Sequence, residues 1–195
     1  MLPIGSPSST PVKGEFLSPD DATRSPLIDY ERGGVHLNDP SQGLDYQNWK
    51  VYYESGSVKI STVTNTDVTI LFTADLITEV SLAFDQNMRP AVAYVQDGVA
   101  KYRWFDPFLN AIDTIVLTDA KSPMTGLDDK RFRLLSDSDI ILCYLKSNAL
   151  YYRLQRERFI IEHLMGPIPI ASVQQITNVG MTTRNRFEIV VKTQG

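Results

Sequence analysis

The chain has 195 residues, of which 43% are hydrophobic, so it can form one sizeable domain and is too apolar to be wholly disordered. Its formal charge of −4 gives no electrostatic reason to expect binding to nucleic acid or to an anionic membrane. A single cysteine, Cys143, excludes an internal disulfide and a cysteine-based zinc site.

Residues 1–45 differ from the rest of the chain because they hold six of its eleven prolines. Proline lacks an amide hydrogen and favours extended neighbours, so this stretch predicts neither a long helix nor a central strand. It also lacks the basic and apolar segments of a secretory signal, and we expect a soluble protein made in the cytosol. We predict an extended arm that lies on a neighbouring subunit, with Pro26, Tyr30 and Pro40 as candidate contacts.

Residues 46–195 are rich in short β-strand patterns separated by turn dipeptides such as Asp97-Gly98 and Ser147-Asn148. Two-residue turns of this kind join antiparallel strands. No window shows a convincing helical period, so the sequence predicts an all-β fold. The expected strands are 49–54, 57–63, 67–73, 79–84, 91–96, 99–104, 113–118, 131–135, 139–145, 149–154, 159–164, 172–179 and 186–192.

One hairpin pattern recurs along the chain. Residues 93–103 (AYVQDGVAKYR) reappear as residues 143–153 (CYLKSNALYYR), and residues 186–195 match 89–98 in part. A period of about 50 residues built from short strands is typical of propeller blades. The repeat predicts propeller-like antiparallel four-stranded units.

We expect these units to form about three small sheets. Two of them span about 79–119 and 127–165, and a third combines 49–73 with 172–192. Fewer than four blades is unusual for a propeller. Whether the sheets close within one chain or with neighbouring chains is left open by the sequence.

Two segments, 91–95 and 140–145, are apolar on both faces. A strand of this kind is covered on both sides, so both segments are predicted to lie between stacked sheets. We expect Cys143, inside the second segment, to be a buried and unreactive thiol.

The residues that carry catalytic chemistry do not form a recognisable pattern. The two histidines, His36 and His163, have no carboxylate or thiol at a catalytic spacing, and no Gly-x-Ser-x-Gly turn or phosphate-binding loop is present. The acidic groups 128–129 and 137–139 fit turn formation better than a glycosidase pair. We therefore expect no enzymatic activity, no metal and no cofactor.

Aromatic residues cluster with arginines in 102–105 and 151–153. Equivalent placement in two repeats favours packing between sheets, but a stacking platform for sugars or bases is the functional alternative. Tyr102, Trp104, Phe105 and Arg153 are accordingly candidate partner contacts, with Trp104 and Phe105 expected to be exposed. Basic residues over 130–158 could face an acidic partner subunit or DNA in a channel.

Residues 30–44 (YERGGVHLNDPSQGL) and 78–90 (TEVSLAFDQNMRP) resemble small structural proteins of tailed-bacteriophage particles. The resemblance extends through 127–130, 138–142 and 151–153. It implies a virion component of the tail or fibre-attachment apparatus, assembled in the host cytoplasm, with no enzymatic role. Its partners would be neighbouring virion proteins and further copies in a ring, with no membrane and with nucleic acid only if the protein faces the DNA channel.

Two other functions remain open at this stage. A carbohydrate-binding module would contact the host surface through Tyr102, Trp104 and Tyr152. A hydrolase would use Asp128 or Asp137.

Overall fold

A computed structural model describes residues 26–36, 44–62, 67–85, 87–127, 140–168, 174–181 and 187–193. These residues form an all-β structure built of antiparallel sheets, which confirms the all-β class expected from the sequence. Several features predicted from the sequence lie outside the described residues: most of the N-terminal arm, Pro40, the expected strand 131–135, Asp128 and Asp137.

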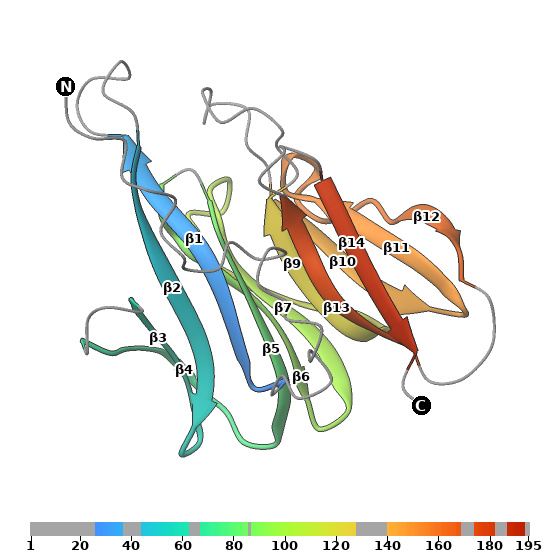
Figure 1. Cartoon of the computed structure of the whole chain (residues 1–195), viewed down its shortest axis with the longest axis horizontal. Helices are drawn as coiled ribbons and strands as arrows, with labels where there is room; N and C mark the ends of the chain where they lie inside the picture. The colour runs from blue at the N-terminus through green and yellow to red at the C-terminus, as the bar shows by residue number, and fades with distance from the viewer. Residues whose placement is uncertain are drawn as a thin grey trace.

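The described strands form four antiparallel sheets (Figure 1), where about three were expected. The first sheet contains β1 (Ile28–His36), β2 (Leu44–Glu54), β3 (Ser57–Thr62) and β4 (Thr69–Thr73). The second contains β5 (Ile77–Phe84), β6 (Pro90–Gln96), β7 (Val99–Asp106) and β8 (Ala111–Val116). The third contains β9 (Lys121–Leu127), β10 (Ile140–Lys146), β11 (Ala149–Leu154) and β12 (His163–Pro167). The fourth contains only β13 (Gln174–Met181) and β14 (Phe187–Thr193).

The hairpin turns agree with the sequence prediction. Asp97 and Gly98 between β6 and β7 both have positive φ, and so do Ser147 and Asn148 between β10 and β11. Positive φ at both central residues is the geometry whose twist matches that of two antiparallel strands. The repeated hairpin is therefore one structural unit that occurs in the second and third sheets.

Three hydrophobic cores lie between the four sheets, one at each junction. In β10, Ile140, Leu142 and Tyr144 pack toward the second sheet, whereas Ile141, Cys143 and Leu145 pack toward β13. β6 divides its side chains in the same way between the first and third sheets. Both strands are thus covered on both faces, as predicted, and Cys143 is buried.

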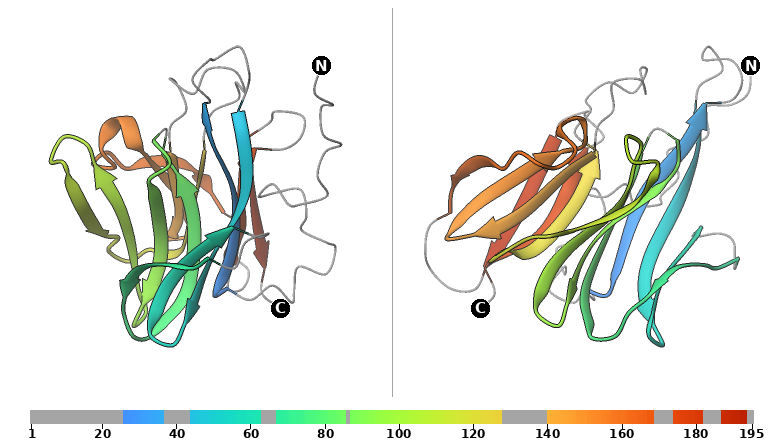
Figure 2. Two further views of the ribbon diagram at one scale, coloured as in Figure 1. Left: turned by 90° about the vertical axis from the view of Figure 1, so that its left-hand side faces the viewer. Right: turned by 180° about the vertical axis from the view of Figure 1, so that it is seen from behind.

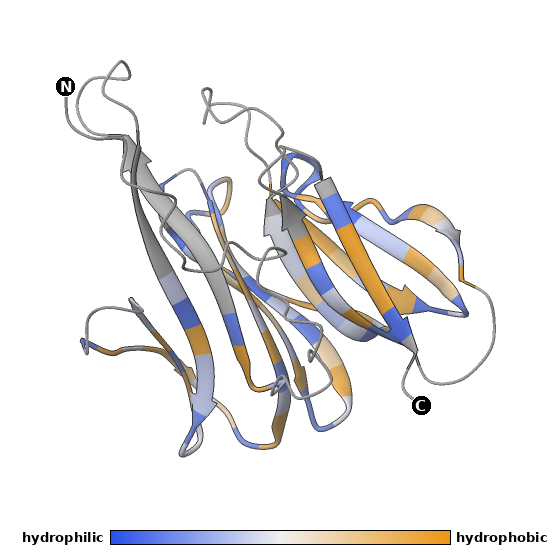
Figure 3. Ribbon diagram, in the orientation of Figure 1, coloured by the Kyte–Doolittle hydropathy of each residue, from blue (hydrophilic) through white to orange (hydrophobic). Residues whose placement is uncertain are grey.

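The sheets stand side by side in sequence order, and their first strands form the line of contact. β1 contacts β5, β5 contacts β9, and β9 contacts β13 (Figures 1 and 2). β13 carries both hydrophobic and hydrophilic bands, and its core residues Ile176 and Val179 are separated by two polar residues (Figure 3). Successive side chains of a strand point to opposite faces, so each sheet has faces that can pack against a neighbour.

Two sequence expectations need correction. The expected third sheet from 49–73 and 172–192 is not formed by the described residues, because β13 and β14 make a sheet of their own. Ile176 and Val179 of β13 pack against the third sheet, far along the chain from β2 and β3. The arm expected over 1–45 is also too long, because residues 28–36 pair with β2 inside the first sheet.

The expected strand 159–164 is shifted in the structure. A short 3₁₀ turn (Gln155–Glu157) follows β11, Arg158 and Phe159 adopt positive φ, and β12 begins only at His163. The reversal places the Phe159 side chain in the core between the second and third sheets. The strand-like pattern at 159–164 therefore arises in part from Phe159, a buried aromatic residue that lies in a turn.

Candidate assembly interface

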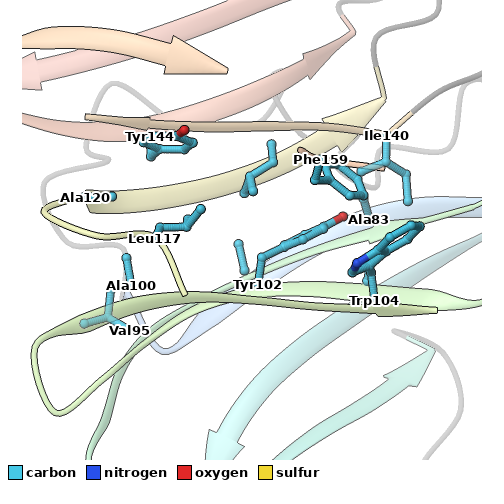
Figure 4. Close-up of a cluster of buried hydrophobic side chains, with 13 residues drawn as sticks. Ala83, Val95, Ala100, Tyr102, Trp104, Leu117, Ala120, Ile140, Tyr144 and Phe159 are labelled. Atoms are coloured by element: carbon cyan, nitrogen blue, oxygen red, sulfur yellow. The ribbon is translucent and has the colours of Figure 1, made fainter. Parts of the chain in front are cut away.

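Tyr102 and Trp104, two of the candidate partner contacts, are buried rather than exposed. Their exposed fractions are 0% and 2%, and both rings pack edge-on against Phe159, with centroid distances of 4.7 and 4.9 Å (Figure 4). The expectation that Trp104 is an exposed hairpin aromatic is therefore wrong. A carbohydrate site built on Tyr102 and Trp104 would have to open the core, so packing explains these residues.

Phe105 lies on the opposite face of β7 from Trp104 and is partly buried. The guanidinium of Arg89 lies over its ring, 4.1 Å from the centroid. Arg89 is itself held by Asp85, which accepts a hydrogen bond from Arg89 Nε and another from its backbone N–H. Phe105 therefore already packs against Arg89, which belongs to the same sheet.

Arg153 belongs to a network of charged groups inside the third sheet. It donates from Nε to the Tyr144 hydroxyl at 2.8 Å and from Nη1 to the Phe159 carbonyl at 3.1 Å. The Tyr144 hydroxyl in turn donates to Glu162 at 2.6 Å, and Lys146 also bonds Glu162. Burial, followed by the bond to Glu162, raises the pKa of Tyr144, so its hydroxyl stays protonated.

Asp106 and Arg158 join the second sheet to the third. The Asp106 carboxylate is 1% exposed and accepts hydrogen bonds from Arg158 and from the backbone N–H of Phe108 and Leu109. Burial alone would raise the pKa of Asp106, but these hydrogen bonds outweigh it and lower the pKa. The ion pair is therefore formed at neutral pH and fixes the turn that carries Phe159.

Of the two histidines, only His163 has a described side chain. Its Nε2 lies 2.6 Å from Glu157 Oε2, and its ring stacks on Tyr152 at a centroid distance of 4.8 Å. Tyr152 is the third residue of the carbohydrate-binding site expected as an alternative function, and its ring already stacks on His163. Within the described residues, no group of three or more His, Cys, Asp and Glu is placed to hold a metal ion.

Two of the three candidate contacts in the arm, Pro26 and Tyr30, are described, and they lie at the start of the first sheet. Pro26 is exposed and its carbonyl accepts a hydrogen bond from Val80 N–H of β5, whereas Tyr30 lies in β1 opposite Lys50. Both are therefore held by backbone contacts within the chain.

The sequence reasoning missed the apolar residues that the structure exposes on the outermost strands. Ile70 of β4, Ile112 and Val116 of β8, and Leu164 and Met165 of β12 all have more than 40% of their surface exposed. More apolar residues lie in the adjoining loops, among them Phe108, which is 78% exposed. A period-2 pattern of apolar residues does not tell which face is covered, so the sequence held no signal for this exposure.

A second missed feature is a set of polar side chains on the first strands of the first three sheets. Asp29 Oδ2 of β1 accepts a hydrogen bond from Leu82 N–H of β5 at 2.9 Å. Ser81 Oγ of β5 accepts one from Thr125 N–H of β9 at 3.0 Å, and Ser122 Oγ of β9 accepts one from Ile176 N–H of β13 at 2.9 Å. Neighbouring sheets are thus joined by buried hydrogen bonds as well as by apolar packing.

Comparisons with known proteins give no relative for this arrangement. No protein-family model matches the chain, no curated protein matches its sequence, and no solved structure matches its fold. Across the residues that are described, no helix has the length and apolar character needed to cross a membrane.

Proposed function

We propose that this chain is a structural component of a bacteriophage virion, in the tail or fibre-attachment apparatus, that acts by subunit assembly. The observation that carries the proposal is the exposure of apolar side chains on the outermost strands of three sheets. Edge strands offer unpaired backbone groups, and exposed apolar patches mark protein contact sites. The resemblance of residues 30–44 and 78–90 to virion proteins names the class of partner: neighbouring virion proteins and further copies of the chain.

A propeller-like arrangement of the sheets is part of this proposal. The first three sheets are four-stranded meanders in simple sequence order, and the first strands of successive sheets lie side by side. Both features are typical of blades that stand around a common axis. Such a body presents its outermost strands, including β4, β8 and β12, to neighbouring proteins. The proposal assigns no catalytic step to the chain.

The proposal is tested on purified particles of the phage that encodes the chain. We expect mass spectrometry to find the chain in particles at a fixed copy number, and gold-labelled antibodies to mark the tail or its attachment site. A chain that is found only in the soluble fraction of infected cells, and never in particles, would contradict the proposal.

Substitutions on β8 test whether the exposed apolar residues make the contact. Ile112, Thr114 and Val116 are all exposed and alternate with the partly buried Asp113 and Ile115. We expect the double variant Ile112→Asp, Val116→Asp to fold but to be incorporated into particles at least tenfold less, because a buried unpaired charge costs several kcal/mol. The matched control is Thr114→Asp, which adds a charge to the same face at a polar position.

A further inference from the structure

Two turns that meet at the junction between the second and third sheets expose large apolar side chains. The turn between β7 and β8 carries Phe108 and Leu109, and the turn between β11 and β12 carries Ile160 and Ile161. Their exposed fractions are 78%, 56%, 69% and 51%. More than half of each residue is therefore open to solvent in the single chain, and we call these four residues the turn patch.

The turn patch is held in place by contacts between the two turns. The Asp106 carboxylate accepts hydrogen bonds from Arg158 and from the backbone N–H of Phe108, and the Arg158 guanidinium lies over the Phe108 ring, 4.6 Å from its centroid. Phe159, next to Ile160, is anchored in the core. The patch is therefore a preformed surface, so a partner that covers it loses little affinity to the ordering of loops.

Glu157, Arg158 and Glu162 lie next to the turn patch, and each already has a partner within the chain. Arg158 pairs with Asp106. Glu157 Oε2 lies 2.6 Å from Nε2 of His163, and Glu162 belongs to the charge network of the third sheet. The turn patch is therefore an apolar surface whose border does not select a partner of strong positive or negative charge.

Charge complementarity favours a second copy of the chain as the partner. A contact around a twofold axis brings one surface onto itself, so an unpaired charge there would face a like charge. The chain has a formal charge of −4, and copies repel each other wherever unpaired acidic groups meet. The turn patch avoids this repulsion, because its neighbouring charges are paired. The same net charge disfavours a membrane of anionic lipids as the partner.

We propose that the turn patch is the contact between two copies of this chain related by a twofold axis. Leu164 and Met165 of β12, which are 60% and 42% exposed, extend the apolar surface along the chain. The arrangement fits the usual anatomy of a dimer contact, in which apolar residues form the centre and polar groups form the rim. A standard contact buries about 800 Å² per partner, so the rim around Glu157 and Arg158 is covered as well as the apolar residues.

This inference rests on the proposed assembly function, because it names the partner at one surface, and it is tested on the purified full chain without particles. Two double variants carry opposite charges: Ile160→Lys with Ile161→Lys, and Ile160→Glu with Ile161→Glu. We expect sedimentation to give a dimer for the natural chain and a dissociation constant raised at least tenfold for each variant alone, since like charges then face each other. An equal mixture of the two variants should form a mixed dimer that is tighter than either variant alone, because the twofold axis places Lys opposite Glu.

Leu76→Lys is the matched control. Leu76 is 63% exposed and lies before β5, outside the turn patch. The substitution adds the same charge at another exposed apolar position, so we expect it to leave dimerisation intact. Because Ile160 and Ile161 are exposed, both double variants should keep the urea midpoint of the monomer, which shows that they fold.

Two further measurements test the alternative occupants. Flotation with vesicles of neutral phosphatidylcholine tests a lipid surface, and a chain that lacks residues 1–25 tests the N-terminal segment. We expect no flotation, and a dimer that forms equally well without residues 1–25.

Several results would overturn the inference. A chain that is monomeric at all concentrations, or charged variants that dimerise like the natural chain, would mean that the turn patch is not the contact. A mixture that fails to restore the dimer would mean that the two copies do not meet patch to patch. Flotation that the Glu variant loses would assign the patch to lipid, and a dimer that is lost with residues 1–25 would assign it to that segment. None of these results decides whether the chain enters particles, so the proposed function keeps its own test.

Discussion

At the scale of single residues, the junction between the second and third sheets depends on two adjacent residues with left-handed backbone. Arg158 and Phe159 both have φ near 55°, which non-glycine residues rarely adopt. The conformation sends Arg158 to the buried Asp106 and Phe159 into the core against Tyr102 and Trp104. An ion pair with hydrogen bonds to backbone and a fully buried ring together offset the cost of the strained turn.

Glu162 provides a pH-dependent test of the neighbouring charge network. The hydrogen bond from Tyr144 lowers the pKa of Glu162 most, burial opposes it, and Lys146 and Arg153 lower it further. A lowered carboxyl pKa adds stability that is present above the ordinary pKa of 4.5 and is lost as the pH falls through the folded value. We expect Glu162→Gln to lower the free energy of unfolding at neutral pH, with a difference from the natural chain that shrinks in acid.

Urea unfolding between about pH 3 and about pH 7 measures this difference. Glu54→Gln is the matched control, because the Glu54 side chain is 64% exposed and its bond to Lys59 lies at the surface. Exposed pairs contribute little to stability. A Glu162→Gln deficit that is equal at all pH values would contradict the assigned network.

At the scale of elements, β9 and β13 approach each other closely at a glycine. A Cβ atom on Gly126 would lie 2.6 Å from the Val179 carbonyl oxygen, closer than real Cβ contacts. We expect Gly126→Ala to lower the free energy of unfolding by about 1–3 kcal/mol, since the backbones must move apart. Urea unfolding measures the change, and Gly166→Ala in β12 is the control because no heavy atom lies within 4 Å of its Cβ. Equal stability of the two variants would mean that β9 and β13 are not held at this distance.

Some strands and turns could be predicted from local sequence, and others could not. Turn dipeptides and doubly apolar strands are local features, so the hairpins and the buried segments 91–95 and 140–145 could be predicted. β1 and β9 were missed because Gly33, Gly34 and Pro123 weaken their strand patterns. The position of β13 against the third sheet and the burial of Trp104 depend on which faces of the sheets meet, and no short segment encodes that.

At the scale of the whole molecule, the boundary between arm and body decides what truncation does. Removing residues 1–25 leaves every described strand intact, and we expect the urea midpoint to stay unchanged. Removing residues 1–45 also deletes β1, its pairing with β2 and the buried Asp29–Leu82 hydrogen bond. We expect that loss to lower Tm by on the order of 10 °C, since each kcal/mol shifts the Tm of a chain of this size by about 2–4 °C. Asp29→Ala in the full chain is the control and should reproduce part of the loss. Calorimetry on the full chain and on the two truncated chains measures these Tm values. Equal destabilisation by both truncations would place the boundary of the body within the first 25 residues.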